Sequence, residues 1–338
     1  MGADSIPWLY LIVVPVLAFF AATLLSPLTI RLSRRRGLLD RPSGRRLHAV
    51  PTPRLGGIPL YFGFLAALLV TLPFPRSDPN ELAKVIGLLI GMTIIVAVGA
   101  YDDLRELRPL PQFVFQFLAA LAAILAGVVI DRIPGPLGGD IRLEWLAVPF
   151  TLFWIVGMMN TINFLDGVDG LASGVTVIAG AVLFAHTFEL GQTSLTLLPL
   201  ALIGGTLGFL IYNFPPARIF LGSGAYLLGF LLAVMSIIGG AKVATALLVL
   251  AIPILDVAWQ ILHRLLTGHS PFAADRGHLH HRLYDLGHSP RTILIIYYAL
   301  TAAFGVLALV LPNPVYKLVA LIVIGIGALA ALIRLGKG

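Results

Sequence analysis

The sequence contains no cysteine, and it is short of charged residues. Without a thiol the chain has no disulfide framework and no thiolate ligands for a metal ion. Only 12% of its residues are Asp, Glu, Lys or Arg, about half the share of an ordinary soluble domain. A soluble protein with so few charged groups would have too little polar surface to cover itself. The composition therefore excludes the soluble globular class.

Long apolar runs take the place of the missing charge. Hydrophobic residues make up 58% of the 338-residue chain, and its mean hydropathy is +0.96. Most runs have about the 20 residues with which an α-helix crosses a bilayer. We therefore expect an all-α, polytopic transmembrane helix bundle of about 10 or 11 helices, forming one domain over residues 1–338. The expected helices are 8–30, 57–74, 83–100, 112–130, 146–162, 168–188, 195–212, 223–240, 243–262, 292–311 and 314–334.

The basic residues predict the orientation of this bundle. No basic residue precedes the first apolar run and a basic cluster follows it, which favours a permanent helix over a cleaved signal peptide. With the N-terminus outside, seventeen of the 23 Lys and Arg residues fall on the cytoplasmic side. The positive-inside rule supports this orientation, in which the C-terminus is cytoplasmic. Because the basic residues lie in short loops between apolar runs, the net charge of +7 indicates membrane headgroups and not nucleic acid as the partner.

Polar residues able to carry chemistry gather on the predicted cytoplasmic side. Ionisable groups at membrane depth usually mark function, so we expect a single site assembled between helices. A transporter or flippase is a distant alternative, because it would usually show inverted repeats and a site near the bilayer midplane. The expected site loops are 31–56, 101–111, 160–170, 213–224 and 263–291.

Two adjacent carboxylates, Asp102 and Asp103, close the third predicted helix. They repel each other and lie at the negative end of the helix dipole, so a cation should offset them. Arg105 and Arg108 would do so as a simple surface cluster. The functional alternative is a hard cation such as Mg²⁺, which prefers carboxylate oxygens and keeps bound waters. The pair by itself does not decide between the two.

The segment NTINFLDGVDGLASG, residues 160–174, carries Asn163, Asp166 and Asp169 at intervals of three residues. At the start of the sixth predicted helix, this spacing puts the three side chains near one face of a helical turn. Asp166 would also serve as an ordinary helix cap. Gly167 and Gly170 permit close approach of the backbone to a ligand, although helix packing in lipid uses glycine too. We favour a ligand-binding role.

A third segment, DRGHLHHRLYDLG, combines His278, His280 and His281 with Arg276 and Arg282. A zinc site is one interpretation, but its spacing fits no common zinc finger. A solvated basic loop against lipid headgroups is another. Because imidazole and guanidinium groups both donate hydrogen bonds to phosphate oxygens, we expect a phosphate-binding patch.

Two further features stay open at the level of sequence. Arg45, Arg46, His48 and Arg54 lie in a proline-containing loop, and they serve either as orientation signals or as part of a shaped site. Asp256, in the ninth predicted helix, either pairs with a neighbouring helix or belongs to the site.

Taken together, the motifs PTPRLGG, YDD, NFLDGVDG, FLGSGAYLLGF and GHLHHRL resemble those of the polyprenyl-phosphate N-acetylhexosamine-1-phosphate transferases. These bacterial membrane enzymes begin cell-envelope glycan synthesis, and the resemblance covers most of the chain. The GHLHHRL form is similar to the branch that uses UDP-N-acetylglucosamine or a related UDP-sugar. The branch that uses UDP-muramoyl-pentapeptide ranks second.

The resemblance implies that the phosphate of a polyprenyl lipid attacks a UDP-sugar and releases UMP, at the cytoplasmic face of the bacterial inner (plasma) membrane. It implies Mg²⁺ as cofactor, with Mn²⁺ as an alternative, and it allows a homodimer. The residue roles that it implies are metal ligands at Asn163 and Asp166; nucleotide contacts at Asp169 and Phe220; diphosphate contacts at His278, His280, His281 and Arg282; acceptor positioning or deprotonation by Asp102 or Asp103; and contacts to the lipid phosphate from Arg45, Arg46, His48 and Arg54.

The sequence departs from the family pattern at two positions. The family has an aspartate after FLG, expected to bind Mg²⁺, but here Ser223 follows Gly222 directly. Gln112 stands where the family usually has a Lys or Arg. The first departure leaves two alternatives. Either Asp103, Asp166 or waters complete the metal site, or the chain is a catalytically impaired homologue that only binds lipid or nucleotide.

Overall fold

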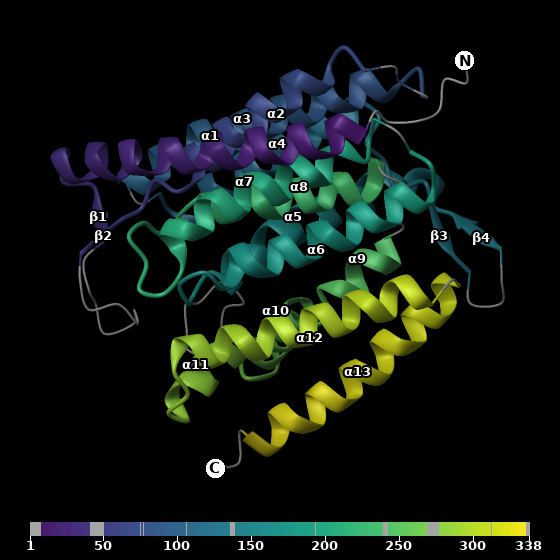
Figure 1. Ribbon diagram of the computed structural model, residues 1–338. Helices are drawn as coiled ribbons and strands as arrows, with labels where there is room; N and C mark the ends of the chain where they lie inside the picture. Colours follow the sequence, from purple (N-terminus) through teal and green to yellow (C-terminus); the bar gives the residue numbers. More distant parts are fainter. Residues whose placement is uncertain are drawn as a thin grey trace.

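The computed structural model describes residues 8–40, 51–74, 76, 78–105, 107–135, 139–192, 194–238, 243–268, 277–311 and 313–335. These residues form a bundle of long helices, and two short antiparallel strand pairs lie at its two ends (Figure 1). The prediction of an all-α, multi-helix membrane bundle is confirmed. The helices are α1 Trp8–Arg35, α2 Gly57–Thr71, α3 Glu81–Arg105, α4 Pro109–Leu125, α5 Ala147–Leu165, α6 Leu171–Glu189, α7 Leu197–Asn213, α8 Gly224–Ile238, α9 Val243–Val249, α10 Ala251–Leu266, α11 Leu279–Asp285, α12 Pro290–Val310 and α13 Pro314–Leu335.

Helix length and composition account for the membrane setting. Within the described part of the chain, α1, α3, α5 with its preceding 3₁₀ turn at Glu144–Leu146, α6 and α12 are each long and apolar enough to span a bilayer. The bent pair α9 and α10 makes a sixth span if it is counted as one. Shorter apolar helices, namely α2, α4, α7, α8 and the first part of α13, fill the bundle between them. The chain is therefore a multi-pass membrane protein.

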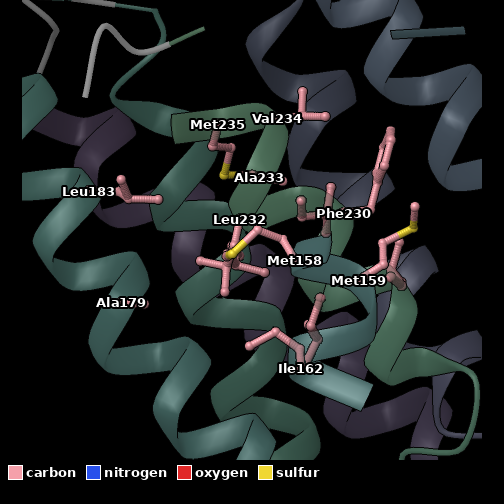
Figure 2. Packing of buried hydrophobic residues seen from close by; sticks show 14 of the residues in the cluster. Met158, Met159, Ile162, Ala179, Leu183, Phe230, Leu232, Ala233, Val234 and Met235 are labelled. Carbon is pink, nitrogen blue, oxygen red and sulfur yellow. The ribbon is translucent and has the colours of Figure 1, made fainter. Parts of the chain in front are cut away.

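Close helix packing depends on glycine. A Cβ added at Gly204 of α7 would lie 2.1 Å from the carbonyl oxygen of Pro15 in α1, and one added at Gly229 of α8 would lie 2.6 Å from that of Met158 in α5. Small residues of this kind let helix backbones approach each other in lipid, where no hydrophobic effect drives association. Around Met158, the side chains of α5 and α8 pack together in a hydrophobic core (Figure 2).

The ninth predicted helix is wrong as a single element. Residues 243–262 belong to two helices, α9 and α10, whose axes meet at 84°. The cause is local. Pro253 has no N–H to donate, and its ring clashes with the carbonyl group four residues earlier, at Val249, where α9 ends. The bend turns α10 toward α11.

The acidic segment lies between two helices and not on the sixth helix as predicted. Asn163 is in the last turn of α5, Asp166 directly follows that helix, and Asp169 precedes α6. Gly170 has a φ of +76°, a left-handed conformation that L side chains rarely adopt, so α6 begins only at Leu171. The interpretation of Asp166 as a cap of the sixth helix is wrong for the same reason.

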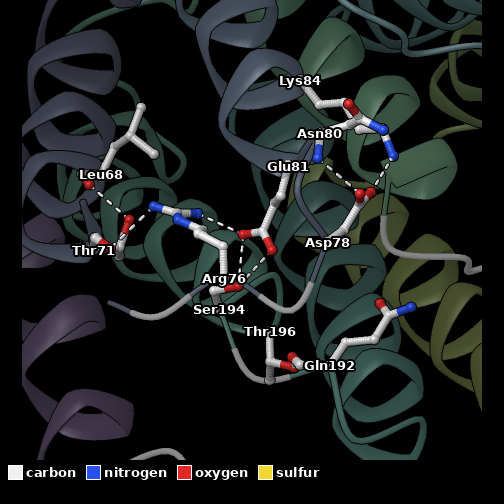
Figure 3. A network of polar contacts seen from close by, with 10 residues as sticks. All are labelled: Leu68, Thr71, Arg76, Asp78, Asn80, Glu81, Lys84, Gln192, Ser194 and Thr196. Carbon is white, nitrogen blue, oxygen red and sulfur yellow. Dashed lines mark hydrogen bonds and ion pairs between the residues drawn. The ribbon is translucent and has the colours of Figure 1, made fainter. Parts of the chain in front are cut away.

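The two ends of the bundle differ in their loops. The pair β1 Leu39–Asp40 and β2 Thr52–Pro53 lies at the same end as α11, on the left of Figure 1, and the pair β3 Arg132–Pro134 and β4 Asp140–Arg142 lies at the opposite end. A buried ion pair also marks this opposite end (Figure 3). Arg76 donates to Glu81 at 2.5 Å, and the Ser194 hydroxyl donates to the same carboxylate at 2.6 Å.

Candidate active site

Asp103, in the last turn of α3, is held by the start of α8. The backbone N–H of Ser223 donates to its carboxylate at 3.1 Å, and the Ser223 hydroxyl donates at 2.8 Å. The turn before Ser223 is tight, because Gly222 has a φ of +56° and a Cβ there would lie 2.4 Å from the carbonyl oxygen of Arg54. The shortened FLGSG loop thus brings Ser223 onto Asp103, in a turn where an L side chain has no room.

Asp102 points to different partners from its neighbour. Its carboxylate accepts the backbone N–H of Leu107 at 2.7 Å and the side-chain amide of Gln112 at 3.0 and 3.1 Å. Gln112 therefore does have a function at the position where a basic residue was expected: it ties the start of α4 to the end of α3. The two adjacent carboxylates therefore have different partners: Asp102 bonds to Leu107 and Gln112, and Asp103 bonds to Ser223 of the FLGSG loop.

Asp166 and Asp169 lie in the turn between α5 and α6. Burial raises the pKa of Asp166 well above its usual range, and repulsion from Asp169 and Asp103 raises it further. Asp169 accepts the backbone N–H of Ala217 at 2.9 Å and so anchors the loop between α7 and α8. Asn163 is half-buried one turn before Asp166, whose N–H donates to the Asn163 carbonyl oxygen at 3.2 Å. Three predicted acids therefore share one neighbourhood.

The loop with Phe220 is paired with β2 and with the residues that follow it. The Phe220 N–H donates to the carbonyl oxygen of Pro53 at 2.7 Å, and the Gly56 N–H donates to the carbonyl oxygen of Phe220 at 3.1 Å. The guanidinium group of Arg54 pairs with Asp40, and both side chains are largely buried. The two backbone hydrogen bonds of Phe220 tie the first site loop, residues 31–56, to the Phe220 loop. Three further predicted residues of the first site loop, Arg45, Arg46 and His48, lie outside the described residues, as does Arg276.

The histidine segment, residues 277–285, begins beside α10. His278 precedes α11, and its Nδ1 lies 2.9 Å from the carboxylate of Asp256 in α10. The Arg282 guanidinium donates to the carbonyl oxygen of Gly277 at 2.8 Å, and the Gln260 side-chain amide donates to the same oxygen. Asp256, which the sequence left open, therefore contacts the start of the histidine segment.

His280 joins the histidine segment to the acidic turn, which is residues 166–170 between α5 and α6. It is 1% exposed, and a Cβ at Gly167 would lie 2.2 Å from its Nε2. Neither of its ring nitrogens has a hydrogen-bond partner among the described residues. Burial, followed by the neighbouring rings of His281 and His278, holds the pKa of His280 well below its usual range. The ring is therefore neutral at physiological pH and free to donate one hydrogen bond to an anion.

Several residues of the site carry no signal that sequence patterns could have detected. Phe164 stacks on His278 with ring centroids 5.4 Å apart. Ser223 donates to Asp103 from its backbone N–H and from its hydroxyl, and Gln260 donates to the carbonyl oxygen of Gly277. An aromatic, a serine and a glutamine are ordinary in a helical membrane protein, so only the contacts identify them.

The acidic turn fits a hard cation with few protein ligands. Among the residues that the structure describes, no three His, Asp or Glu side chains converge closely enough to enclose a metal ion, so a closed zinc-type site does not fit. Mg²⁺ is different, because it commonly takes one or two carboxylates and keeps waters or substrate phosphates as its other ligands. The repulsion of Asp166 by Asp169 and by Asp103 fits such a site, because a bound cation would offset it.

Comparison with known proteins gives a consistent result. The model of glycosyl transferase family 4 matches residues 85–240. A probable undecaprenyl-phosphate N-acetylglucosaminyl 1-phosphate transferase of Bacillus subtilis is 31% identical over 311 residues, which cover 90% of this chain and 85% of the relative. A decaprenyl-phosphate N-acetylglucosaminephosphotransferase of Mycobacterium tuberculosis is 32% identical over 342 residues, with the same two coverages. A phospho-N-acetylmuramoyl-pentapeptide-transferase of Clostridium perfringens is 30% identical over 313 residues, which cover 87% of this chain and 96% of the relative.

Proposed function

This chain belongs to glycosyl transferase family 4, and from that membership we propose that it transfers a sugar-1-phosphate from a UDP-sugar to a polyprenyl phosphate, releasing UMP. The donor we propose is UDP-N-acetylglucosamine, which fits the names of the relatives with the higher identities. The observation that carries the proposal is the meeting of the acidic turn and the histidine segment, where Gly167 contacts the ring of His280.

The chemistry of this transfer suits the site. An oxygen of the lipid phosphate attacks the sugar-bearing phosphorus of the donor, a new P–O bond forms, and the bond to the UMP oxygen breaks. Both substrates are anions, so positioning and charge neutralisation supply most of the catalysis. A polar site at one end of an apolar bundle gives a membrane-bound acceptor and a water-soluble donor access to the same atoms.

We assign the acidic residues to the cation and to the acceptor. Asn163 and Asp166 would hold Mg²⁺, which neutralises phosphate charge when it is bound. Asp103, which is close enough to Asp166 to raise its pKa, would position the acceptor phosphate. A role for Asp103 as a base is secondary, because a phosphate monoester with a second pKa of about 6 is already largely ionised near neutral pH.

The basic residues would hold the donor. His280 has two ring nitrogens that make no hydrogen bond within the described chain, and it lies beside His278 and His281. With Arg282, these rings would donate hydrogen bonds to the diphosphate. Asp169 and Phe220, at the two loops joined through Ala217, would contact the nucleotide.

We also propose the cellular setting. The seventeen basic residues that the sequence assigns to the cytoplasmic side favour a cytoplasmic site in the bacterial inner membrane, with the N-terminus outside and the C-terminus inside. The assembly that we propose in the membrane is a homodimer.

The experiment that tests the transfer is UMP release by the purified protein in detergent. Undecaprenyl phosphate and UDP-N-acetylglucosamine are supplied with Mg²⁺ or with a chelator, and a parallel reaction contains UDP-N-acetylmuramoyl-pentapeptide. We expect metal-dependent UMP release with the first donor. Release with the pentapeptide donor alone would identify the second branch, and no release with either donor would contradict the transfer.

Two variants compare the roles of the adjacent carboxylates in this assay. Asp103→Asn should lower turnover by roughly 100-fold, since it removes a charge beside the reacting phosphates. Asp102→Asn should lose less, because an asparagine oxygen can still accept the Leu107 N–H. Equal activity of both variants and the unaltered protein would remove Asp103 from the mechanism.

One observation favours a second candidate, a homologue that binds substrates without transferring between them. Ser223 donates two hydrogen bonds to Asp103, at the position where the family has an aspartate. Binding of UDP-N-acetylglucosamine to well-folded protein that releases no UMP would select this candidate.

A further inference from the structure

Asp256 contacts the start of the histidine segment with both of its carboxylate oxygens. One oxygen lies 2.9 Å from Nδ1 of His278, and the other accepts the backbone N–H of Leu279 at 2.9 Å. Asp256 is 6% exposed and His278 is equally buried, so water competes little for these contacts. A buried carboxylate with both oxygens on one short segment determines where that segment lies.

From this geometry we propose that Asp256 is a positioning residue, which holds His278 in one tautomer and one orientation toward the diphosphate of the UDP-sugar. The inference rests on the proposed function for the identity of the ligand. The residue acts through His278 and does not itself contact the substrate.

The tautomer is inferred from the hydrogen bonds of the two groups. One Asp256 oxygen accepts the Leu279 N–H and the other faces Nδ1 of His278, so we assign a proton to this Nδ1, which donates it to the carboxylate oxygen. Nε2 is then the nitrogen of His278 that remains for a ligand. Carboxylate partners commonly set the tautomer and the ring orientation of functional histidines in this way.

The faces of the His278 ring are also held. Phe164, from the last turn of α5, stacks on the ring with centroids 5.4 Å apart and an interplanar angle of 24°. The ring of His280 stacks at 5.7 Å and 8°. With Asp256 at its edge and two rings packed against it, His278 has little freedom to rotate.

The bend before α10 makes this contact available. Asp256 and Gln260 lie one turn apart on one face of α10, and both contact the segment at Gly277–Leu279. The helix axis turns by 84° after α9, which directs this face toward α11. The break at Pro253 thus has a local consequence at the site.

The first test is the variant Asp256→Asn, assayed for UMP release with UDP-N-acetylglucosamine. Asparagine keeps an oxygen for the Leu279 N–H but presents an N–H₂ group where His278 needs an acceptor. We expect kcat/KM to fall by about tenfold or more, as for other partners that orient functional histidines. An unchanged kcat/KM would overturn the inference.

The matched control is Glu81→Gln, at the opposite end of the bundle. Glu81 is also a buried carboxylate, 1% exposed, and it accepts hydrogen bonds from Arg76 and Ser194 (Figure 3). This variant should lower the melting temperature of the detergent-solubilised protein and keep kcat/KM within about twofold. An equal loss of kcat/KM in both variants would indicate that Asp256 contributes only stability.

A double-mutant comparison separates positioning from any independent role of Asp256. If Asp256 acts only through His278, adding Asp256→Asn to His278→Ala should change kcat/KM by less than about twofold. Full additivity of the two losses would overturn the inference.

A spectroscopic test does not need transferase activity. The protein is labelled with ¹⁵N-histidine, and the His278 signals are identified by their loss in His278→Ala. We expect a protonated Nδ1 in the unaltered protein, and a change at Nδ1 in Asp256→Asn. A neutral His278 with its proton on Nε2 would overturn the inference. Absence of UMP release with the expected tautomer would instead count against the proposed function alone.

Discussion

At the scale of single residues, the site depends on close approaches between side chains and backbone. His280 packs directly against the Cα of Gly167, and Asp103 lies within reach of the turn at Gly222. These two glycines belong to different segments, the acidic turn and the FLGSG loop. Neither glycine has room for a methyl group. The distance of His280 from the acidic turn, and that of Asp103 from the FLGSG loop, are therefore set by contacts with glycine backbone.

Gly167→Ala tests this spacing. The new Cβ would lie 2.2 Å from Nε2 of His280, so the ring must move away from the acidic turn. We expect KM for UDP-N-acetylglucosamine to rise at least about tenfold in the UMP-release assay.

Gly157→Ala is its control, because a Cβ at Gly157 in α5 meets no atom within 4 Å. This control should leave KM unchanged and stabilise the helix by up to about 1 kcal/mol, since glycine is a poor helix former. Similar KM values in the two variants would mean that His280 does not contact the donor.

At the scale of elements, the short loop between α7 and α8 controls the acidic cluster. The Gly224 N–H donates to the carbonyl oxygen of Leu221 at 3.0 Å, which closes the turn directly before α8. The same turn brings the Ser223 hydroxyl within hydrogen-bonding distance of Asp103. The turn itself carries no carboxylate between Gly222 and Ser223. The length of the loop therefore decides how many acids surround Asp103.

Inserting Asp between Gly222 and Ser223 should strengthen the cation site. The longer turn would release Ser223 from Asp103 and add a carboxylate beside it, so a hard cation would gain a ligand. We expect tighter Mg²⁺ dependence and a higher rate of UMP release in a Mg²⁺ titration.

The control for this insertion is Ala at the same position, which lengthens the loop without adding charge. If the Ala insertion raised Mg²⁺ affinity as much as the Asp insertion, the effect would come from loop length and not from a new ligand.

At the scale of the whole molecule, the two ends of the bundle have different roles. The site loops and α11 lie at one end, and the β3–β4 pair and the buried ion pair of Glu81 lie at the other (Figure 1). A site at one end can meet a cytoplasmic donor only when the bundle is inserted with that end inside, so the direction of insertion can be tested.

Cysteine labelling tests this direction, because the chain has no cysteine of its own. His288 and Asp140 are both exposed and lie at opposite ends. In intact cells, a membrane-impermeant maleimide should label Asp140→Cys, and it should label His288→Cys only after permeabilisation. The reverse pattern would place the site outside the cytoplasm.

The sequence by itself determined the class of protein and most of the helices. A bilayer requires apolar runs of a definite length, so helices such as α3 and α12 are visible in composition alone. Acids and histidines near the ends of such runs are rare, which made Asp103, Asp166 and His280 visible as candidates. Their roles in catalysis stay predictions.

Only the tertiary structure decided how these groups meet. The contact of Gly167 with His280, the bonds from Ser223 to Asp103 and the pairing of Asp256 with His278 join segments that are distant in sequence. No local pattern encodes such contacts, because they depend on the bend after α9, on the break between α5 and α6, and on how closely glycines let backbones approach. Residue types indicate which chemistry is available, and packing determines which atoms are within reach of each other.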